Sequence, residues 1–291
     1  MKINVEGIET EYKITGPEVS ADDTAPETMV ILQGWGTDMG LYDSVAEALS
    51  DRMRVVQFDF PGFGGTPEPP EAWPVKRYAQ WFLHLMEALK IQEASLMGHS
   101  YGGRVIIELA SRDDLDFRIR KLLLVDSAGV MPQRSNEQKW KVKKYKAIKK
   151  LAGLRLSRML CPQLIEEWQS RQGSADYRNA TPLMRNALVM AVNYDQRELL
   201  PKIRQETLLV WGNLDTATPL SDGETMDRLI PDSGLAIIKG TGHYSFLERK
   251  DVFRKILEVY FPAEDSGEKT MDSPAMAEMA ESPATQEEAR K

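Results

Sequence analysis

Residues 96 to 103 read Leu96-Met97-Gly98-His99-Ser100-Tyr101-Gly102-Gly103. The apolar run at 94–97 predicts a short buried strand, and the run at 105–110 predicts a packed helix. Ser100 then stands on a tight strand-to-helix turn, where the glycines two positions before and after it remove Cβ atoms that would collide. The pattern Gly-x-Ser-x-Gly in this setting predicts an exposed nucleophilic hydroxyl, with a structural glycine-rich turn as the alternative.

A serine nucleophile needs a base to remove its proton, and the sequence holds three histidines. We expect His99 to be structural, because its side chain leaves the turn in another direction. His84 lies in a segment that predicts a helix, where a surface role is expected. His243 stands in the loop Lys239-Gly240-Thr241-Gly242-His243-Tyr244-Ser245, after the apolar run at 235–238. A loop at the end of a strand suits a catalytic base, so we predict that His243 is the base.

The base is oriented by an acid, which we expect at the end of another strand. Asp215 follows the strand predicted at 207–212, and Asp126 follows the one at 122–125. We favour Asp215, because its loop contains turn-forming residues and Asp126 leads into a long insertion. The resulting chain order is Ser, Asp, His. For either residue the competing interpretation is a turn or helix-cap aspartate.

Five separated motifs then come in one order. They are Gln33-Gly34-Trp35-Gly36, Asp59-Phe60-Pro61-Gly62-Phe63-Gly64, the Ser100 turn, Gly212-Asn213-Leu214-Asp215 and Gly242-His243. In this order they resemble the α/β-hydrolase superfamily over roughly residues 1–262. The resemblance implies a mostly parallel eight-stranded sheet flanked by helices, with an inserted helical cap. One departure is Gln33, where the family often has a supporting histidine.

The resemblance also implies an oxyanion hole. In the family, the residue after the first glycine of the early loop donates one backbone N–H, and that residue is Trp35 here. The second donor is the backbone N–H of Tyr101, directly after the nucleophile. A plain glycine turn is the alternative at the first loop. Phe60 and Phe63 are candidates to line the neighbouring pocket.

Strands alternate with helical segments outside one long insertion, which predicts a parallel sheet with the site at its carboxyl ends. We expect an N-terminal antiparallel hairpin over 2–15 and a helix over 74–90. The domain boundaries follow: core at 1–131 and 205–263, helical cap at 132–204, and a disordered acidic tail at 264–291.

Composition bounds the setting of the protein. The 291 residues carry a net charge of −7, a single cysteine (Cys161), no secretory h-region and no run of eighteen apolar residues. We therefore expect a cytoplasmic protein with no integral membrane segment and no nucleic-acid partner. Seven lysines fall within 139–150, which indicates either a solvated outer cap helix or a contact with anionic lipid or substrate. The sequence gives no oligomeric state.

The sequence thus predicts a serine hydrolase of the carboxylesterase class (EC 3.1.1), acting on a small, largely apolar ester without cofactor or metal. A carbon–carbon hydrolase, a thioesterase or an amidase would use the same residues. A dehalogenase is disfavoured, because it would carry an aspartate in place of Ser100. The rival from another class is a non-catalytic small-molecule binding protein on the same fold.

Overall fold

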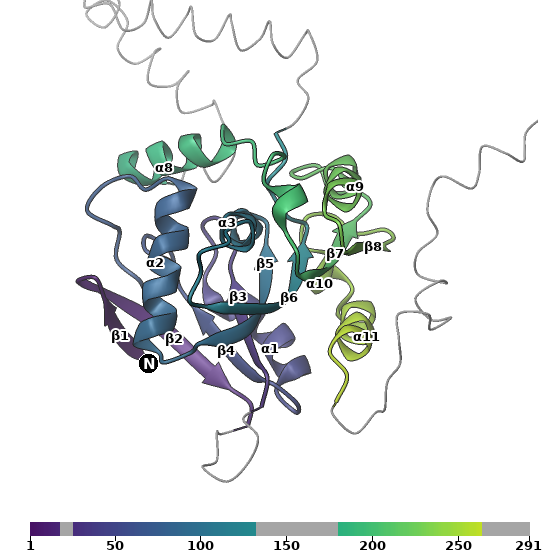
Figure 1. Cartoon of the computed structure of the whole chain (residues 1–291), viewed down its shortest axis with the longest axis horizontal. Coiled ribbons are helices and arrows are strands. Elements are labelled where there is room, and N and C mark those ends of the chain that lie inside the picture. The colour runs from purple at the N-terminus through teal and green to yellow at the C-terminus, as the bar shows by residue number, and fades with distance from the viewer. Residues whose placement is uncertain (18–25, 132–179, 264–291) are drawn as a thin grey trace, which may run out of the picture.

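The computed structural model describes residues 1–17, 26–131 and 180–263. Eight strands form one sheet in the spatial order β1-β2-β4-β3-β5-β6-β7-β8 (Figure 1). Their bounds are β1 Lys2–Val5, β2 Ile8–Thr15, β3 Thr28–Leu32, β4 Arg54–Phe58, β5 Glu93–His99, β6 Arg118–Val125, β7 Glu206–Gly212 and β8 Ser233–Ile238. The first two strands pair antiparallel, β2 pairs antiparallel with β4, and the remaining neighbours pair parallel. The prediction of a mostly parallel α/β sheet is confirmed.

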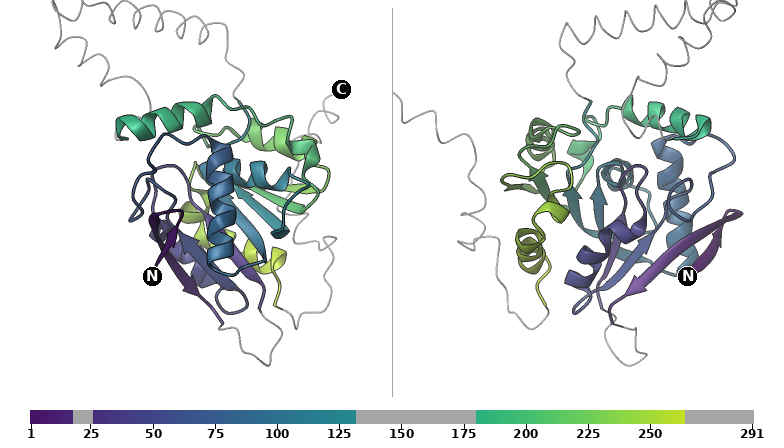
Figure 2. Two further views of the ribbon diagram at one scale, coloured as in Figure 1. Left: turned by 60° about the vertical axis from the view of Figure 1, so that its left-hand side comes forward. Right: turned by 180° about the vertical axis from the view of Figure 1, so that it is seen from behind.

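Helices cover both faces of the sheet (Figures 1 and 2). The described helices are η1 Met39–Tyr42, α1 Asp43–Leu49, α2 Val75–Ala88, α3 Tyr101–Ala110, α8 Pro182–Val192, η2 Leu200–Lys202, α9 Leu220–Leu229, α10 Ser245–Glu248 and α11 Lys250–Tyr260. One apolar core packs α2, α3 and α9 on the sheet, and a second packs α1 and α11 on its other face. Strands buried on both sides explain why the central segments read as continuous apolar runs.

Helix α3 begins at Tyr101, four residues before the apolar run that predicted it. The first turn of α3 contains Gly102 and Gly103. Glycine has poor helix propensity, but both of these residues are buried. Tertiary contacts therefore extend the helix up to Ser100, which places the serine directly at its N-terminus.

The predicted cap at 132–204 is only partly within the described residues. Residues 132–179, with Cys161 and the lysine-rich segment at 139–150, lie outside them, as does the tail at 264–291. In the described part, α8 begins with Thr181 as its N-cap, whose hydroxyl accepts the Met184 N–H at 3.2 Å. Met184 is buried as a core residue, whereas Met190 is 38% exposed.

Candidate active site

Ser100 occupies the turn between β5 and α3 in an uncommon backbone conformation. Its φ is 50° and its ψ is −107°, a region that non-glycine residues seldom adopt. Three backbone hydrogen bonds hold it there. The Ser100 N–H donates to the Val125 carbonyl at 3.1 Å, and the Ser100 carbonyl accepts from the N–H groups of Ala128 and Gly103. The surrounding strands thus impose a conformation that an isolated turn would avoid.

The two flanking glycines are required by close approach. A Cβ atom on Gly102 would lie 2.0 Å from the Leu32 carbonyl oxygen, and one on Gly98 would lie 2.7 Å from the Gly103 nitrogen. Neither gap admits a side chain. This turn therefore needs glycine for space, as the sequence pattern predicts.

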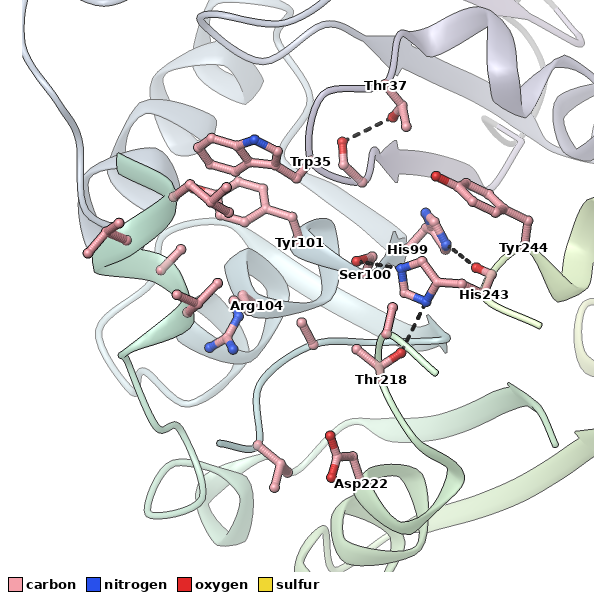
Figure 3. A pocket seen from close by; sticks show the side chains of 18 residues that line it. Trp35, Thr37, His99, Ser100, Tyr101, Arg104, Thr218, Asp222, His243 and Tyr244 are labelled. Carbon is pink, nitrogen blue, oxygen red and sulfur yellow. Dashed lines mark hydrogen bonds between the residues drawn. The ribbon is translucent and has the colours of Figure 1, made fainter. Parts of the chain in front are cut away.

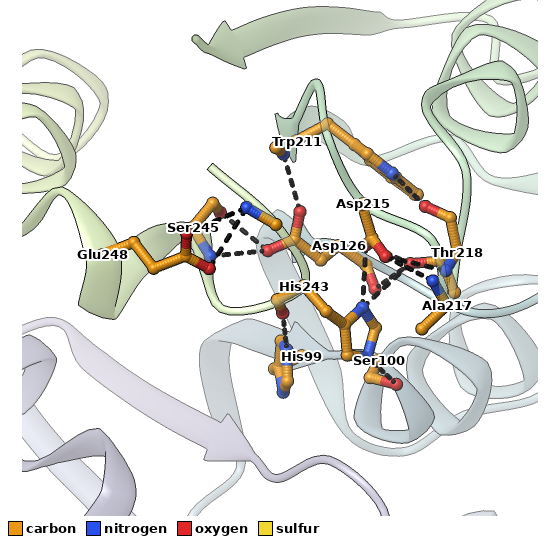
Figure 4. A network of polar contacts seen from close by, with 12 residues as sticks. His99, Ser100, Asp126, Trp211, Asp215, Ala217, Thr218, His243, Ser245 and Glu248 are labelled. Carbon is orange, nitrogen blue, oxygen red and sulfur yellow. Dashed lines mark hydrogen bonds and ion pairs between the residues drawn. The ribbon is translucent and has the colours of Figure 1, made fainter. Parts of the chain in front are cut away.

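A chain of hydrogen bonds joins Ser100, His243 and Asp215 (Figure 4). Ser100 Oγ lies 3.0 Å from His243 Nε2, and His243 Nδ1 lies 2.7 Å from Asp215 Oδ2. With the Nδ1 proton donated to the carboxylate, Nε2 is left to accept the serine proton. The Asp215 carboxylate is fully buried, whereas His243 is partly exposed to the cavity.

The loop after β7 fixes the Asp215 carboxylate. Its Oδ1 accepts from the backbone N–H groups of Ala217 at 2.7 Å and Thr218 at 3.0 Å, and Thr218 Oγ1 donates to Oδ2 at 2.7 Å. Burial raises the pKa of Asp215, but the hydrogen bonds from His243 and Thr218 outweigh burial and leave that pKa below its usual range. Sequence reasoning missed Thr218; its position three residues after the acid, in the same turn, was the available signal.

Asp126, the competing acid, is held elsewhere. Its Oδ1 accepts the Gly212 N–H at 2.8 Å, and its Oδ2 accepts both the N–H and the hydroxyl of Ser245, at 3.1 and 2.7 Å (Figure 4). Burial raises the pKa of this carboxyl to about 6. The structure therefore places Asp215 against His243, while Asp126 ties the end of β7 to the start of α10.

The two residues expected to form the oxyanion hole, Trp35 and Tyr101, both line the cavity that contains Ser100. Tyr101 is the first residue of α3, so its N–H has no partner within the helix. Among the described residues, the N–H groups of Tyr101 and Trp35 donate no hydrogen bond. The Gly34 N–H is already used, because it donates to Tyr42 Oη at 2.7 Å. The arrangement leaves the Trp35 and Tyr101 amides available to a negatively charged oxygen.

The side chain of Gln33 braces the Trp35 loop. Its Nε2 donates to the Thr37 carbonyl and, at 3.4 Å, to Asp59 Oδ1, while its Oε1 accepts the Phe60 N–H at 3.3 Å. Gln33 thus fills the supporting position where the resemblance suggested a histidine. Phe60 and Phe63 do not line the cavity: both rings pack against Tyr101, at centroid distances of 6.0 and 6.2 Å.

His99 links the two loops that flank the serine. Its Nε2 donates to the His243 carbonyl at 2.8 Å, and its Nδ1 accepts from Tyr42 Oη at 3.0 Å. Burial, with a smaller contribution from His243, lowers the pKa of His99 to about 3, so the ring is neutral. As expected from the sequence, His99 lies in the support of the site. His84 lies on α2, where it contacts Gln80 and Glu6.

The cavity above Ser100 has a volume of about 400 Å³, within the range of small-molecule sites. Apolar side chains of α8 form one wall, and Trp35 and Tyr244 lie near the serine (Figure 3). Two charged residues, Arg104 and Asp222, also line it, and sequence reasoning named neither. In the described ranges no three His, Cys, Asp or Glu side chains gather to hold a metal ion, and no helix is both long and apolar enough to cross a bilayer.

Comparison with known proteins gives consistent matches. The sequence model of the alpha/beta hydrolase family matches residues 29–256. A pimeloyl-[acyl-carrier protein] methyl ester esterase of Aeromonas hydrophila is 27% identical over 250 residues, covering 79% of this chain and 93% of the relative. A 2-hydroxy-6-oxo-2,4-heptadienoate hydrolase of Pseudomonas putida is 26% identical over 281 residues, covering 89% and 95%.

Solved structures agree with these matches at the level of the fold. The enol-lactonase from Burkholderia xenovorans superposes with a TM-score of 0.65 at 24% identity, covering 89% of this chain and 99% of that one. The resemblance inferred from the five motifs is therefore confirmed.

Proposed function

We propose that this chain, which belongs to the alpha/beta hydrolase family, is a serine hydrolase. Its expected substrates are carboxylic esters that are small and largely apolar. The observation that carries the proposal is the continuous chain of hydrogen bonds from Ser100 Oγ through His243 to Asp215. A nucleophile, a base and an orienting acid within hydrogen-bond reach are the parts that acyl transfer needs.

In the proposed reaction, Ser100 Oγ attacks the ester carbonyl while His243 Nε2 takes its proton. Asp215 stabilises the imidazolium that forms, and the amides of Trp35 and Tyr101 bind the oxyanion. Each such donor is typically worth about 100- to 1,000-fold in rate. Collapse expels the alcohol, which takes the proton from His243. Water activated by the same histidine then hydrolyses the acyl-enzyme and regenerates Ser100.

We further propose that α8 supplies a substrate wall and limits water at the site. Leu188, Val189, Ala191 and Val192 line the same cavity as Ser100 and His243. An apolar wall favours an apolar acyl or alcohol group and lowers the local dielectric around the reacting atoms. The cytoplasm remains the proposed compartment, argued from the single cysteine.

Labelling with a fluorophosphonate probe tests the proposal. The native chain should label, while Ser100→Ala and His243→Ala should lose labelling because the activated nucleophile is gone. His84→Ala is the matched control on α2 and should label like the native chain. Absence of labelling in a well-folded native chain would favour the non-catalytic binding protein instead.

A carbon–carbon bond hydrolase is the second candidate, favoured by the similarity to the Pseudomonas putida dienoate hydrolase. The same triad serves either bond. A panel of matched esters, thioesters, amides and dienoates, compared by kcat/KM, separates the candidates. The ester assignment requires the ester to be the best substrate; a dienoate preference of tenfold or more would replace it.

A further inference from the structure

Two charged side chains lie in the cavity apart from the residues of the proposed reaction. Arg104 is on α3, on the turn of helix that follows Ser100, and is 5% exposed. Asp222 is on the first turn of α9 and is 8% exposed. Both line the cavity that holds Ser100 (Figure 3). The rest of α3 after Arg104 is largely apolar, so a cation here needs a physical reason.

The hydrogen bonding of Arg104 leaves most of its donors to the cavity. Within the described residues, Nη1 donates to the Tyr194 carbonyl at 2.6 Å and no carboxylate pairs with the guanidinium. Asp195 lies nearby, but Arg197 Nε donates to both of its oxygens, at 3.0 and 2.9 Å. A guanidinium carries five N–H donors in a fork that matches a carboxylate. Tyr194 thus anchors one donor and leaves the fork presented to a ligand.

The Asp222 carboxylate is the opposite charge to Arg104 in this cavity, but the two side chains do not form an ion pair. In the described part of the chain its carboxylate accepts no hydrogen bond, and it interacts with Arg104 through space. Burial raises the pKa of Asp222 to about 6, and Arg104 acts against that rise. Among the described residues, the Arg104 guanidinium therefore has no carboxylate in direct contact with it, and an anionic group of a ligand could form that contact.

We propose that Arg104 binds a carboxylate carried by the acyl chain of the substrate, so that the preferred ester is a half-ester of a dicarboxylic acid. This inference rests on the proposed serine hydrolase function. The apolar wall of α8 would pack on the methylene chain between the two ends, with the ester at Ser100 and the carboxylate at Arg104. The Asp222 carboxylate would repel the bound anion, so it would lower the preference for half-esters over neutral esters.

The test compares monomethyl esters of straight-chain dicarboxylic acids of four to eight carbons with methyl esters of monocarboxylic acids of equal length. In the native enzyme the best half-ester should exceed its neutral match in kcat/KM by about 10- to 100-fold, the usual strength of a charge-assisted hydrogen-bond pair. Arg104→Met should abolish the preference, Arg104→Lys should keep part of it, and Asp222→Asn should increase it.

Arg112→Met is the matched control, because Arg112 follows α3 but lines a different cleft. Hydrolysis of the neutral ester reports folding and the serine hydrolase function in each variant. A native enzyme that hydrolyses neutral esters with no preference for half-esters would overturn the inference and leave the function standing.

If neither ester is hydrolysed, the proposed function fails, and binding decides the inference separately. Calorimetry on Ser100→Ala should then give a Kd for the half-ester that weakens at least tenfold when Arg104→Met is added. Equal affinity of the single and double variants would refute the carboxylate site.

Discussion

At the scale of single residues, Tyr42 connects the loop that contains Gly34 and Trp35 to the loop that contains His243. Its hydroxyl accepts the Gly34 N–H and donates to His99 Nδ1, and His99 in turn holds the His243 carbonyl. The Tyr42 ring also stacks on Phe246, with centroids 5.2 Å apart. One side chain thus connects the two loops that carry the Trp35 amide and the His243 imidazole of the proposed reaction.

Tyr42→Phe tests this role. It leaves the buried Gly34 N–H and His99 Nδ1 without their partner, which should lower the free energy of unfolding by about 1 to 3 kcal/mol. We also expect kcat to fall more than KM rises, because in the proposed reaction the amide of Trp35, which this change would displace, binds the oxyanion. Steady-state kinetics and urea unfolding measure the two effects. A stability loss with unchanged kcat would reduce Tyr42 to a purely structural residue.

Some residues of the site could be predicted from the sequence and others could not. Ser100, His243 and Asp215 stand in local patterns of glycine, strand end and loop that are readable without coordinates. Tyr42 and Arg104 stand in no such local pattern. Tyr42 contacts His99, 57 positions away in the sequence, and Arg104 contacts Tyr194, 90 positions away. An arginine inside an apolar helix was a visible signal, but its direction depends on how α3 packs.

At the scale of elements, the unit formed by β5, Ser100 and α3 depends on how closely α3 approaches β3. Gly102→Ala would place a Cβ 2.0 Å from the Leu32 carbonyl, so helix and strand must separate. We expect a loss of more than about 3 kcal/mol or failure to fold, since a backbone clash cannot be relieved by a rotamer change.

Gly234→Ala is the matched control. It lies in β8, where an added Cβ meets nothing within 4 Å. The free energy of unfolding should change by less than about 0.5 kcal/mol or rise slightly. Chemical denaturation of both variants checks the pair, and a Gly102→Ala protein as stable as the native one would contradict the packing argument.

Strand positions were the most predictable elements. The hairpin expected over 2–15 is formed by β1 and β2, and β6 contains the strand predicted at 122–125, whose side chains are buried. β5, β7 and α3 are longer than their apolar runs, since sheet pairing and packing recruit polar residues and glycines at the ends. Such extensions depend on neighbours that a local window does not contain.

At the scale of the whole molecule, Asp222 makes stability depend on pH. Its pKa rises from 3.8 unfolded to about 6 folded, so the native state binds more protons in that window. Stability contributed by this group is full below about pH 4 and is lost as pH rises through about 6. Asp126 changes in the same direction, so only the difference from a variant isolates Asp222.

Asp222→Asn should therefore be more stable than the native chain at pH 8, by about 1 to 3 kcal/mol, with the difference closing towards pH 4. Urea unfolding across this range measures both curves. A constant difference at all pH values would show that the carboxyl does not titrate as the structure implies.

The elements that form the second apolar core are synthesised at very different times during translation. β3 and α1 share the second core with α11, which leaves the ribosome some two hundred residues after them. Until α11 emerges, α1 covers only part of that face of the nascent sheet, and the rest is exposed to aggregation. Only the short helix α10 separates the loop that bears His243 from α11, so the base is synthesised late, about 140 residues after Ser100. A prematurely released chain would therefore carry Ser100 without the means to activate it.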